Sequence, residues 1–107
     1  MAVYLKRRAI NNLKSIFKRL IISKTFPLSK NEAQEYINLI ENQCFFIGNI
    51  SIHKKTIHQE HKPFGVYVHR YKKNSNTTWY IIYNIDRFNN IIIKKILCNN
   101  QMKNKWQ

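Results

Sequence analysis

Residues 77 to 97 are the part of this 107-residue chain that most restricts its possible folds. They read TTWYIIYNIDRFNNIIIKKIL, two runs of β-branched and aromatic residues on either side of a polar turn at residues 86 to 90. Such runs favour β-strands, and the polar residues between them favour a turn. The stretch therefore predicts an antiparallel hairpin, whose apolar residues need other elements to cover them.

The rest of the chain supplies those elements. Residues 2–5 and 64–72 have strand patterns, and residues 50–52 are a further short candidate. Apolar residues recur at helical spacing over residues 8–22 and again over residues 29–47, which predicts two amphipathic helices. The predicted order of elements is β-α-α-β-β-β.

We expect a single α+β domain over residues 1–98, with an antiparallel sheet of about four strands packed on an N-terminal two-helix hairpin. Residues 99–107 show no period and are expected to form a loose tail. The residues expected to be buried where the helices meet the sheet are Ile16, Leu20, Ile37, Ile40, Trp79, Ile81 and Ile93.

Short sequence motifs mark the two ends of the second predicted helix. Ser29 and Glu32 have the spacing of a capping box at its start, and Gly48 is suited to the position just after its end. Cys44 and Cys98 lie in apolar patterns. We therefore expect them to be small core residues in a reducing cytosol and not a disulfide pair.

The charge is strongly positive, with 19 Lys and Arg against 5 Asp and Glu and a net charge of +14. The second predicted helix holds three of the five acids, so the charge is segregated between elements. Such a charge favours a polyanion or an acidic protein as partner, with a nucleic acid or the ribosome first. No signal peptide or membrane span is recognised, so we expect a cytoplasmic protein without a membrane partner.

Alternation along the strands suggests a functional surface. The set that contains Trp79 is the more apolar and should face the helices, which turns Tyr80 outward. If His69 and Tyr71 lie on the Tyr80 side, the outer face is aromatic and basic, as suits unpaired bases. The alternative is ordinary cross-strand tyrosine pairs on a solvated face.

Other chemistry finds less support in the sequence. His53 and His58 have a spacing seen in some zinc sites, but no cysteine or carboxylate cluster completes a set, and we expect no metal and no cofactor. His61 or His69 is a better candidate for a general acid or base, because imidazole titrates near neutral pH. Gly-rich phosphate loops and paired carboxylates are missing from the sequence.

The stretch GVYVHRYKKNSNTTWYIIYNID, followed by NNIIIKKIL, comes after a short basic strand and a two-helix hairpin. This pattern resembles the RelE/ParE superfamily of toxins from type II toxin–antitoxin systems. The resemblance implies a small sheet backed by the helix hairpin, and a growth-arresting activity that a cognate acidic antitoxin protein silences. RelE-type members cut mRNA in the ribosomal A site, and ParE-type members poison DNA gyrase.

RelE-type toxins carry basic residues on the strand before the aromatic strand. The matching positions here are His69, Arg70, Tyr71 and Lys72, and Tyr80 then stands in place of a basic residue. The resemblance thus implies His69, Tyr80 and Tyr71 as catalytic candidates. The expected nucleic-acid-binding residues are Arg70, Lys72, Lys73, Lys54, Lys55 and His61.

One departure concerns the end of the last strand, where a basic residue or histidine is usual in these toxins. This chain has Asn99, Asn100 and Gln101 there, which counts against the nuclease. The interpretation favoured by the sequence is still ribosome-dependent mRNA cleavage. The alternatives are a gyrase inhibitor without nuclease chemistry and a non-toxic protein that binds RNA or the ribosome.

Overall fold

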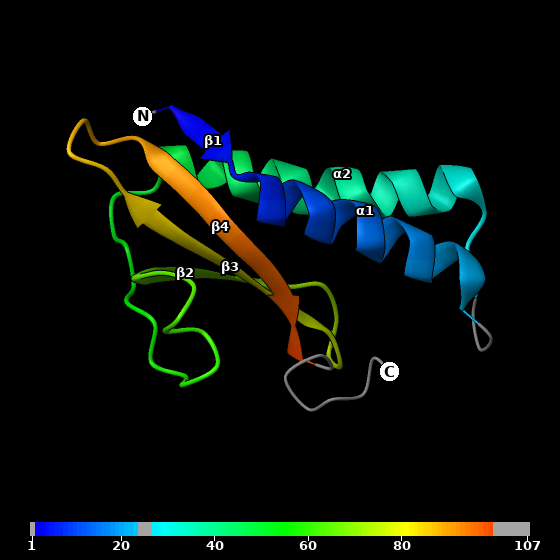
Figure 1. Cartoon of the computed structure of the whole chain (residues 1–107). Helices are drawn as coiled ribbons and strands as arrows, with labels where there is room; N and C mark the ends of the chain where they lie inside the picture. The colour runs from blue at the N-terminus through cyan, green and yellow to red at the C-terminus, as the bar shows by residue number, and fades with distance from the viewer. Residues whose placement is uncertain (1, 24–26, 100–107) are drawn as a thin grey trace.

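The computed structural model describes residues 2–23 and 27–99 (Figure 1). The chain forms a small α+β domain in which two helices cover one face of a four-stranded sheet. Its elements are β1 (Val3–Leu5), α1 (Arg7–Ile22), α2 (Lys30–Phe46), the 3-10 helix η1 (Ile47–Asn49), β2 (Tyr67–Lys72), β3 (Thr78–Ile85) and β4 (Ile91–Cys98). The predicted order is confirmed, but residues 50–52 do not form a strand.

The sheet is mixed and not purely antiparallel as predicted. Its strand order is β1-β4-β3-β2. The last three strands pair antiparallel, whereas β1 pairs parallel to β4 with Val3 opposite Ile91 and Leu5 opposite Ile93. A parallel pair requires a long connection, and here most of the chain lies between the two strands.

The start of α2 follows the sequence prediction. The N–H of Glu32 donates to Ser29 Oγ and the N–H of Ser29 donates to Glu32 Oε1, both at 3.1 Å, which completes the capping box. The end of α2 differs from the sequence prediction. Gly48 lies within η1, which continues directly from α2, and it has no positive φ, so the prediction of a left-handed cap is wrong.

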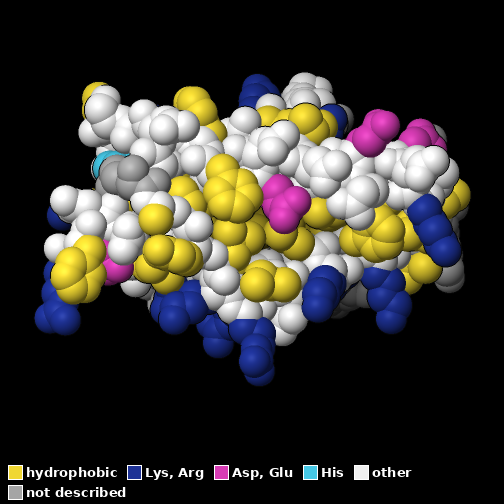
Figure 2. Space-filling view, turned by 90° about the horizontal axis from the view of Figure 1, so that it is seen from above, with side chains coloured by type: hydrophobic (Ala, Val, Ile, Leu, Met, Phe, Trp, Pro, Cys, Tyr) yellow, Lys and Arg dark blue, Asp and Glu magenta, His cyan; other side chains and the backbone are white. Residues whose placement is uncertain are grey.

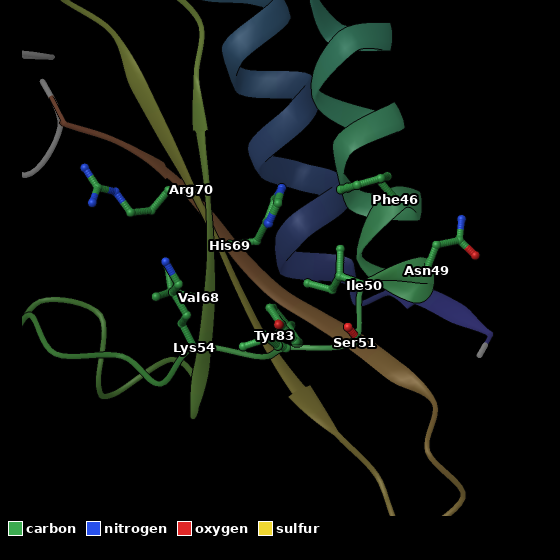
Figure 3. A pocket seen from close by; sticks show the side chains of 10 residues that line it. Phe46, Asn49, Ile50, Ser51, Lys54, Val68, His69, Arg70 and Tyr83 are labelled. Atoms are coloured by element: carbon green, nitrogen blue, oxygen red, sulfur yellow. The ribbon is translucent and has the colours of Figure 1, made fainter.

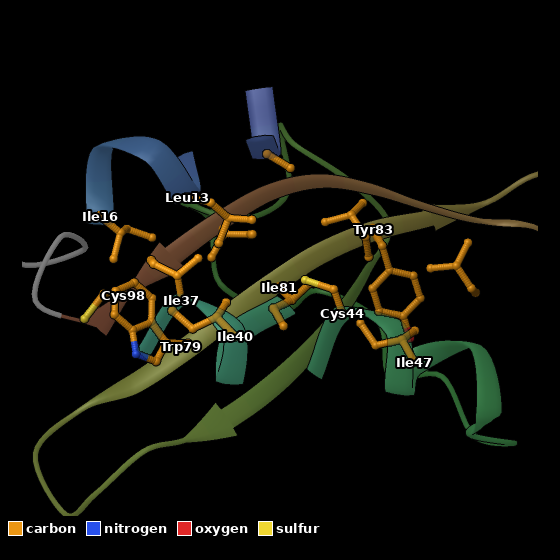
Figure 4. Packing of buried hydrophobic residues seen from close by; sticks show 14 residues of the cluster. Leu13, Ile16, Ile37, Ile40, Cys44, Ile47, Trp79, Ile81, Tyr83 and Cys98 are labelled. Atoms are coloured by element: carbon orange, nitrogen blue, oxygen red, sulfur yellow. The ribbon is translucent and has the colours of Figure 1, made fainter. Parts of the chain in front are cut away.

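The core lies between the helix pair and the sheet (Figure 4). Trp79, Ile81 and Tyr83 of β3 point into it and are at most 1% exposed, which confirms the predicted inward set. Cys44 and Cys98 are fully buried, as predicted, and burial raises the pKa of the Cys44 thiol to about 12. Of the predicted core residues, Ile16, Ile37, Ile40, Trp79, Ile81 and Ile93 are buried, and Leu20 is only partly buried.

A β-bulge interrupts the pairing of β3 with β4. Ile82 lies opposite Lys95 and the next residue, Tyr83, lies opposite Ile93, which leaves Lys94 as an extra residue in β4. A bulge of this kind changes the phase of alternation along its strand.

That change of phase keeps both lysines of β4 out of the core. In regular alternation, the face that carries Ile91 and Ile93 would next present Lys95. With the bulge, four residues of β4 are buried against the helices instead: Ile91, Ile93, Ile96 and Cys98.

Residues 53–66, which we call the covering segment, run from the edge of β2 over part of the second face of the sheet (Figure 1). The segment pairs with the first half of β2, where the N–H of Val68 donates to the oxygen of Lys54 at 2.9 Å. It then packs over β3 with Gly65 against it, where an added Cβ would lie 2.9 Å from Ile82 Cγ2 and 3.1 Å from the oxygen of Tyr83. Glycine is therefore needed for this close approach.

Charge is distributed unevenly over the surface. Most Lys and Arg side chains on the face shown in Figure 2 line its lower long edge, with a few at the upper edge, and Asp and Glu side chains lie mainly at the centre and upper right. α2 contributes Glu32, Glu35 and Glu41 but only Lys30 among basic residues, in line with the predicted segregation. Within the described ranges, the helices are too short or too polar to cross a membrane.

Candidate functional site

The register of β2 and β3 decides where the predicted catalytic residues lie. His69 lies opposite Ile81 and Tyr71 opposite Trp79, so both share the face that packs on the helices. Tyr80 belongs to the other face. The predicted grouping of His69 and Tyr71 beside Tyr80 is therefore wrong.

Tyr80 does turn away from the helices, but its ring is not exposed. The covering segment places the His61 ring 4.7 Å and the His58 ring 6.1 Å from it, and the Arg70 guanidinium lies 5.9 Å from its centroid. Only 8% of Tyr80 is exposed, and the neighbouring Ile82 is fully buried. The predicted aromatic surface for stacking bases is absent from this face.

His61 is also enclosed, with 0% of its surface exposed. Burial, with a smaller effect of the nearby His58, lowers its pKa. Its ring packs on Tyr80, so it does not present a surface to a nucleic acid as predicted.

A pocket of about 530 Å³ opens between the end of α2, η1 and the edge strand β2 (Figure 3). We call it the His69 pocket. Three of the predicted site residues line it, His69, Arg70 and Lys54. The Arg70 guanidinium leaves β2 on the opposite face from His69 and lies over Tyr80, so Arg70 belongs to the rim of the pocket (Figure 3). The remaining lining residues are Phe46, Asn49, Ile50, Ser51, Ile52, Val68 and Tyr83.

His69 has the features of a general base. Its Nε2 lies 3.0 Å from Gln43 Oε1, and a bond to an amide oxygen requires the proton to be on Nε2. Burial lowers the pKa of His69, which favours a neutral ring at pH 7. The other ring nitrogen, Nδ1, is then the basic one and can accept a proton from a substrate.

A second histidine supports the floor of the pocket. The Tyr83 hydroxyl lies 2.7 Å from His53 Nδ1, and the two rings meet edge to face at 5.7 Å. Burial, with an added effect of Tyr67, raises the pKa of Tyr83 to about 12, so the hydroxyl keeps its proton at neutral pH and shares a hydrogen bond with His53. The sequence carries no signal for this pair, because nothing local connects two residues so far apart in the chain.

The remaining predicted residues lie outside the His69 pocket. Tyr71 packs against the core, and the Lys73 ammonium lies 5.2 Å from the Tyr36 ring centroid. Lys72 is exposed on the same side of β2 as Arg70, and Lys55 is exposed where the covering segment meets Tyr67. None of these four side chains lines the His69 pocket.

The end of β4 is occupied by a structural asparagine. Asn99 Oδ1 accepts from the N–H of Thr78 at 3.3 Å, and its Nδ2 donates to the oxygen of Asn76 at 3.1 Å. Asn99 therefore braces the β2–β3 turn. Residues 100–107, the rest of the predicted tail with Asn100 and Gln101, lie outside the described residues.

The histidines do not gather into a metal site. His53 contacts Tyr83 on the helix side of the sheet, whereas His58 contacts Tyr80 on the other side. Over residues 2–23 and 27–99, no three His, Cys, Asp or Glu side chains are grouped to hold a metal ion.

Comparison of the chain with family models, curated proteins and solved structures finds no match.

Proposed function

We propose that the protein is a growth-arresting toxin of the RelE/ParE kind, which cleaves mRNA on the ribosome at the His69 pocket. The observation that carries the proposal is a half-buried imidazole of lowered pKa in a pocket that is also lined by Lys54 and Arg70. A neutral imidazole can remove a proton, and cations at the rim of the pocket can hold the phosphates of an RNA strand next to it.

The proposed reaction needs no metal ion or cofactor. His69 Nδ1 takes the proton of a ribose 2′-hydroxyl, and the 2′-oxygen attacks the adjacent phosphorus. The bond from phosphorus to the 5′-oxygen breaks, and that oxygen takes a proton from water, leaving a 2′,3′-cyclic phosphate and a 5′-hydroxyl. Lys54 and Arg70 at the rim of the pocket hold the adjoining phosphates of the strand, and Gln43 fixes the imidazole through its Nε2–H.

The partners follow from the charge and from the resemblance. A protein of net charge +14 is suited to the ribosome and its mRNA, and to an acidic antitoxin protein in the resting state. We place this activity in the cytoplasm, where ribosomes and antitoxin are found.

A second candidate is inhibition of DNA gyrase by surface docking. It is favoured by Asn99, which stands where these toxins usually have a basic residue or histidine and which binds Thr78 and Asn76 instead of facing the His69 pocket. A non-catalytic inhibitor would have no need of a second catalytic group at that place.

Induced expression in a bacterial host without antitoxin separates these functions. The H69Q variant places an amide nitrogen where Nε2 lies, so it can keep the bond to Gln43 but cannot act as a base. The matched control is H58Q, which changes an exposed histidine of the covering segment. Translation and DNA supercoiling are followed separately in each strain.

We expect the parent and H58Q to stop translation, and H69Q to permit growth as a soluble, folded protein. Loss of supercoiling in the parent, with H69Q equally toxic, would establish the gyrase mode. A parent that binds RNA without arresting growth would be the non-toxic RNA-binding protein.

A further inference from the structure

A second basic region lies on the β1–β4 side of the sheet, away from the His69 pocket on β2. It surrounds a hollow of about 420 Å³ whose lining residues are Lys6, Arg7, Arg8, Pro63, Phe64 and Lys94. Four of these six are cations, and no acid from the described part of the chain lines the hollow. We call the four cations of the hollow, together with Lys95 and Phe64, the Phe64 cluster.

Two of the cations share one aromatic ring. The Arg8 guanidinium lies 5.5 Å and the Lys95 ammonium 5.0 Å from the centroid of Phe64. Burial lowers the pKa of Lys95, and the positive charge of Arg8 lowers it further. Like charges held this close repel each other, and a bound anion would relieve that repulsion.

The backbone around the cluster adds to its positive potential. α1 begins at Arg7, has no acid in its first turn, and has no side-chain hydrogen bond from its N-cap residue, Lys6. The positive end of the helix dipole therefore adds to the charges of the side chains. The bulge in β4 allows Lys94 to reach the hollow while Lys95 reaches Phe64.

We propose that the Phe64 cluster is a second binding site for the phosphate groups of an RNA backbone. The choice of RNA over other phosphate-bearing ligands rests on the proposed function. Four strands span about 14 Å from β1 to β2, so one RNA strand of several nucleotides can contact both this site and the His69 pocket.

The site is suited to the backbone and not to a base. Arg8 and Lys95 already lie over the Phe64 ring, so the ring orients cations instead of stacking on a nucleobase. Binding here should therefore depend strongly on salt and little on sequence.

The test compares two double variants that each remove one Arg and one Lys. R7Q/K94Q removes cations of the hollow that do not pack on Phe64, and K30Q/R87Q removes cations at the start of α2 and in the β3–β4 turn. Fluorescence anisotropy measures binding of a labelled single-stranded RNA of about 12 nucleotides between about 50 and 200 mM salt. Vesicles containing phosphatidylserine are titrated in parallel, and circular dichroism checks folding.

We expect R7Q/K94Q to bind RNA at least about fivefold more weakly than K30Q/R87Q. Its log–log salt slope should be smaller by about 1.4, or 0.7 for each of two lost phosphate contacts. Equal RNA binding by the two variants would overturn the proposal, and so would a selective loss of vesicle binding alone.

The growth assay with H69Q reports separately on the proposed function. If H69Q stays toxic while R7Q/K94Q loses RNA affinity, the catalytic proposal fails and the second site stands. If H69Q relieves arrest while R7Q/K94Q binds RNA like its control, the catalytic proposal stands and the second site fails.

Discussion

The central strand β3 is buried on both faces of the sheet, but by different means. On one face, regular helices cover β3, and the contacts are almost entirely apolar, with the Trp79 indole N–H donating to the Tyr36 hydroxyl at 3.1 Å. On the other, the irregular covering segment packs His61 on Tyr80 and Gly65 on Ile82. The cations of the Phe64 cluster adjoin this second face.

The difference should show in how much each face contributes to stability. The helix face buries large aliphatic side chains and should supply most of the folding free energy. The covered face is closed by histidines, one glycine and cation–aromatic contacts, each of modest strength.

The largest effect should come from the helix face. I81A removes most of a fully buried side chain between β3 and the helices and should reduce the free energy of unfolding by about 2–5 kcal/mol. Urea denaturation measures the change. The control I52A, at a side chain 74% exposed, should change it by less than about 0.5 kcal/mol. Similar losses from both variants would contradict the assignment of the core.

A smaller loss is expected where the covering segment touches the sheet. G65A places a methyl group against Ile82 Cγ2 and the oxygen of Tyr83, and should cost about 1–3 kcal/mol in urea denaturation. G48A is the matched control, since Gly48 has no positive φ and its backbone conformation suits alanine. If G65A is as stable as G48A, the segment does not pack on β3 as described.

The smallest effect is the pH dependence of the covered face. The folded-state pKa of His61 lies below its unfolded value, so the unfolded chain takes up its proton first as the pH falls. Stability should therefore be complete above about pH 6.5 and decline towards pH 5, before the carboxylates titrate. H61Q should show a weaker decline than the parent in urea denaturations at both pH values.

H58Q serves as the control for this experiment. Burial is the main cause of the lowered pKa of His61 and the charge of His58 is secondary, so H58Q should keep most of the decline. A decline that is identical in parent and H61Q would mean that His61 titrates freely in the folded protein.

Features that depend on residues near in sequence could be predicted. Helical spacing gave the two helices, and the Ser29–Glu32 capping box forms as expected. The inward set of β3 follows from alternation, because every second residue of a strand shares a face. These features need no knowledge of which strands pair.

Register between strands could not be predicted in the same way. Alternation shows that His69 and Tyr71 share a face, but not whether that face matches Trp79 or Tyr80. The β2–β3 turn decides this, and it places Lys72 opposite Thr78. The site prediction failed at this step, although His69, Arg70 and Lys54 do line one pocket.

One signal for the covered face was present in the sequence. Residues 79–83 read WYIIY, five large apolar side chains in succession, and all five are buried. A continuous apolar run is typical of a strand covered on both faces, whereas a half-exposed strand alternates. The position of the covering segment itself depends on contacts between distant residues, such as His61 with Tyr80.

The extra residue in β4 also bears on how the protein could change over evolution. If Lys94 were deleted, Ile91, Ile93, Ile96 and Cys98 would fall on one face by plain alternation, and Ile92, Lys95 and Leu97 on the other. Loss or gain of a single codon at this point thus removes or restores one cation without altering the composition of the core. The length of β4 can therefore vary together with the charge of the surface, independently of the residues that hold the fold together.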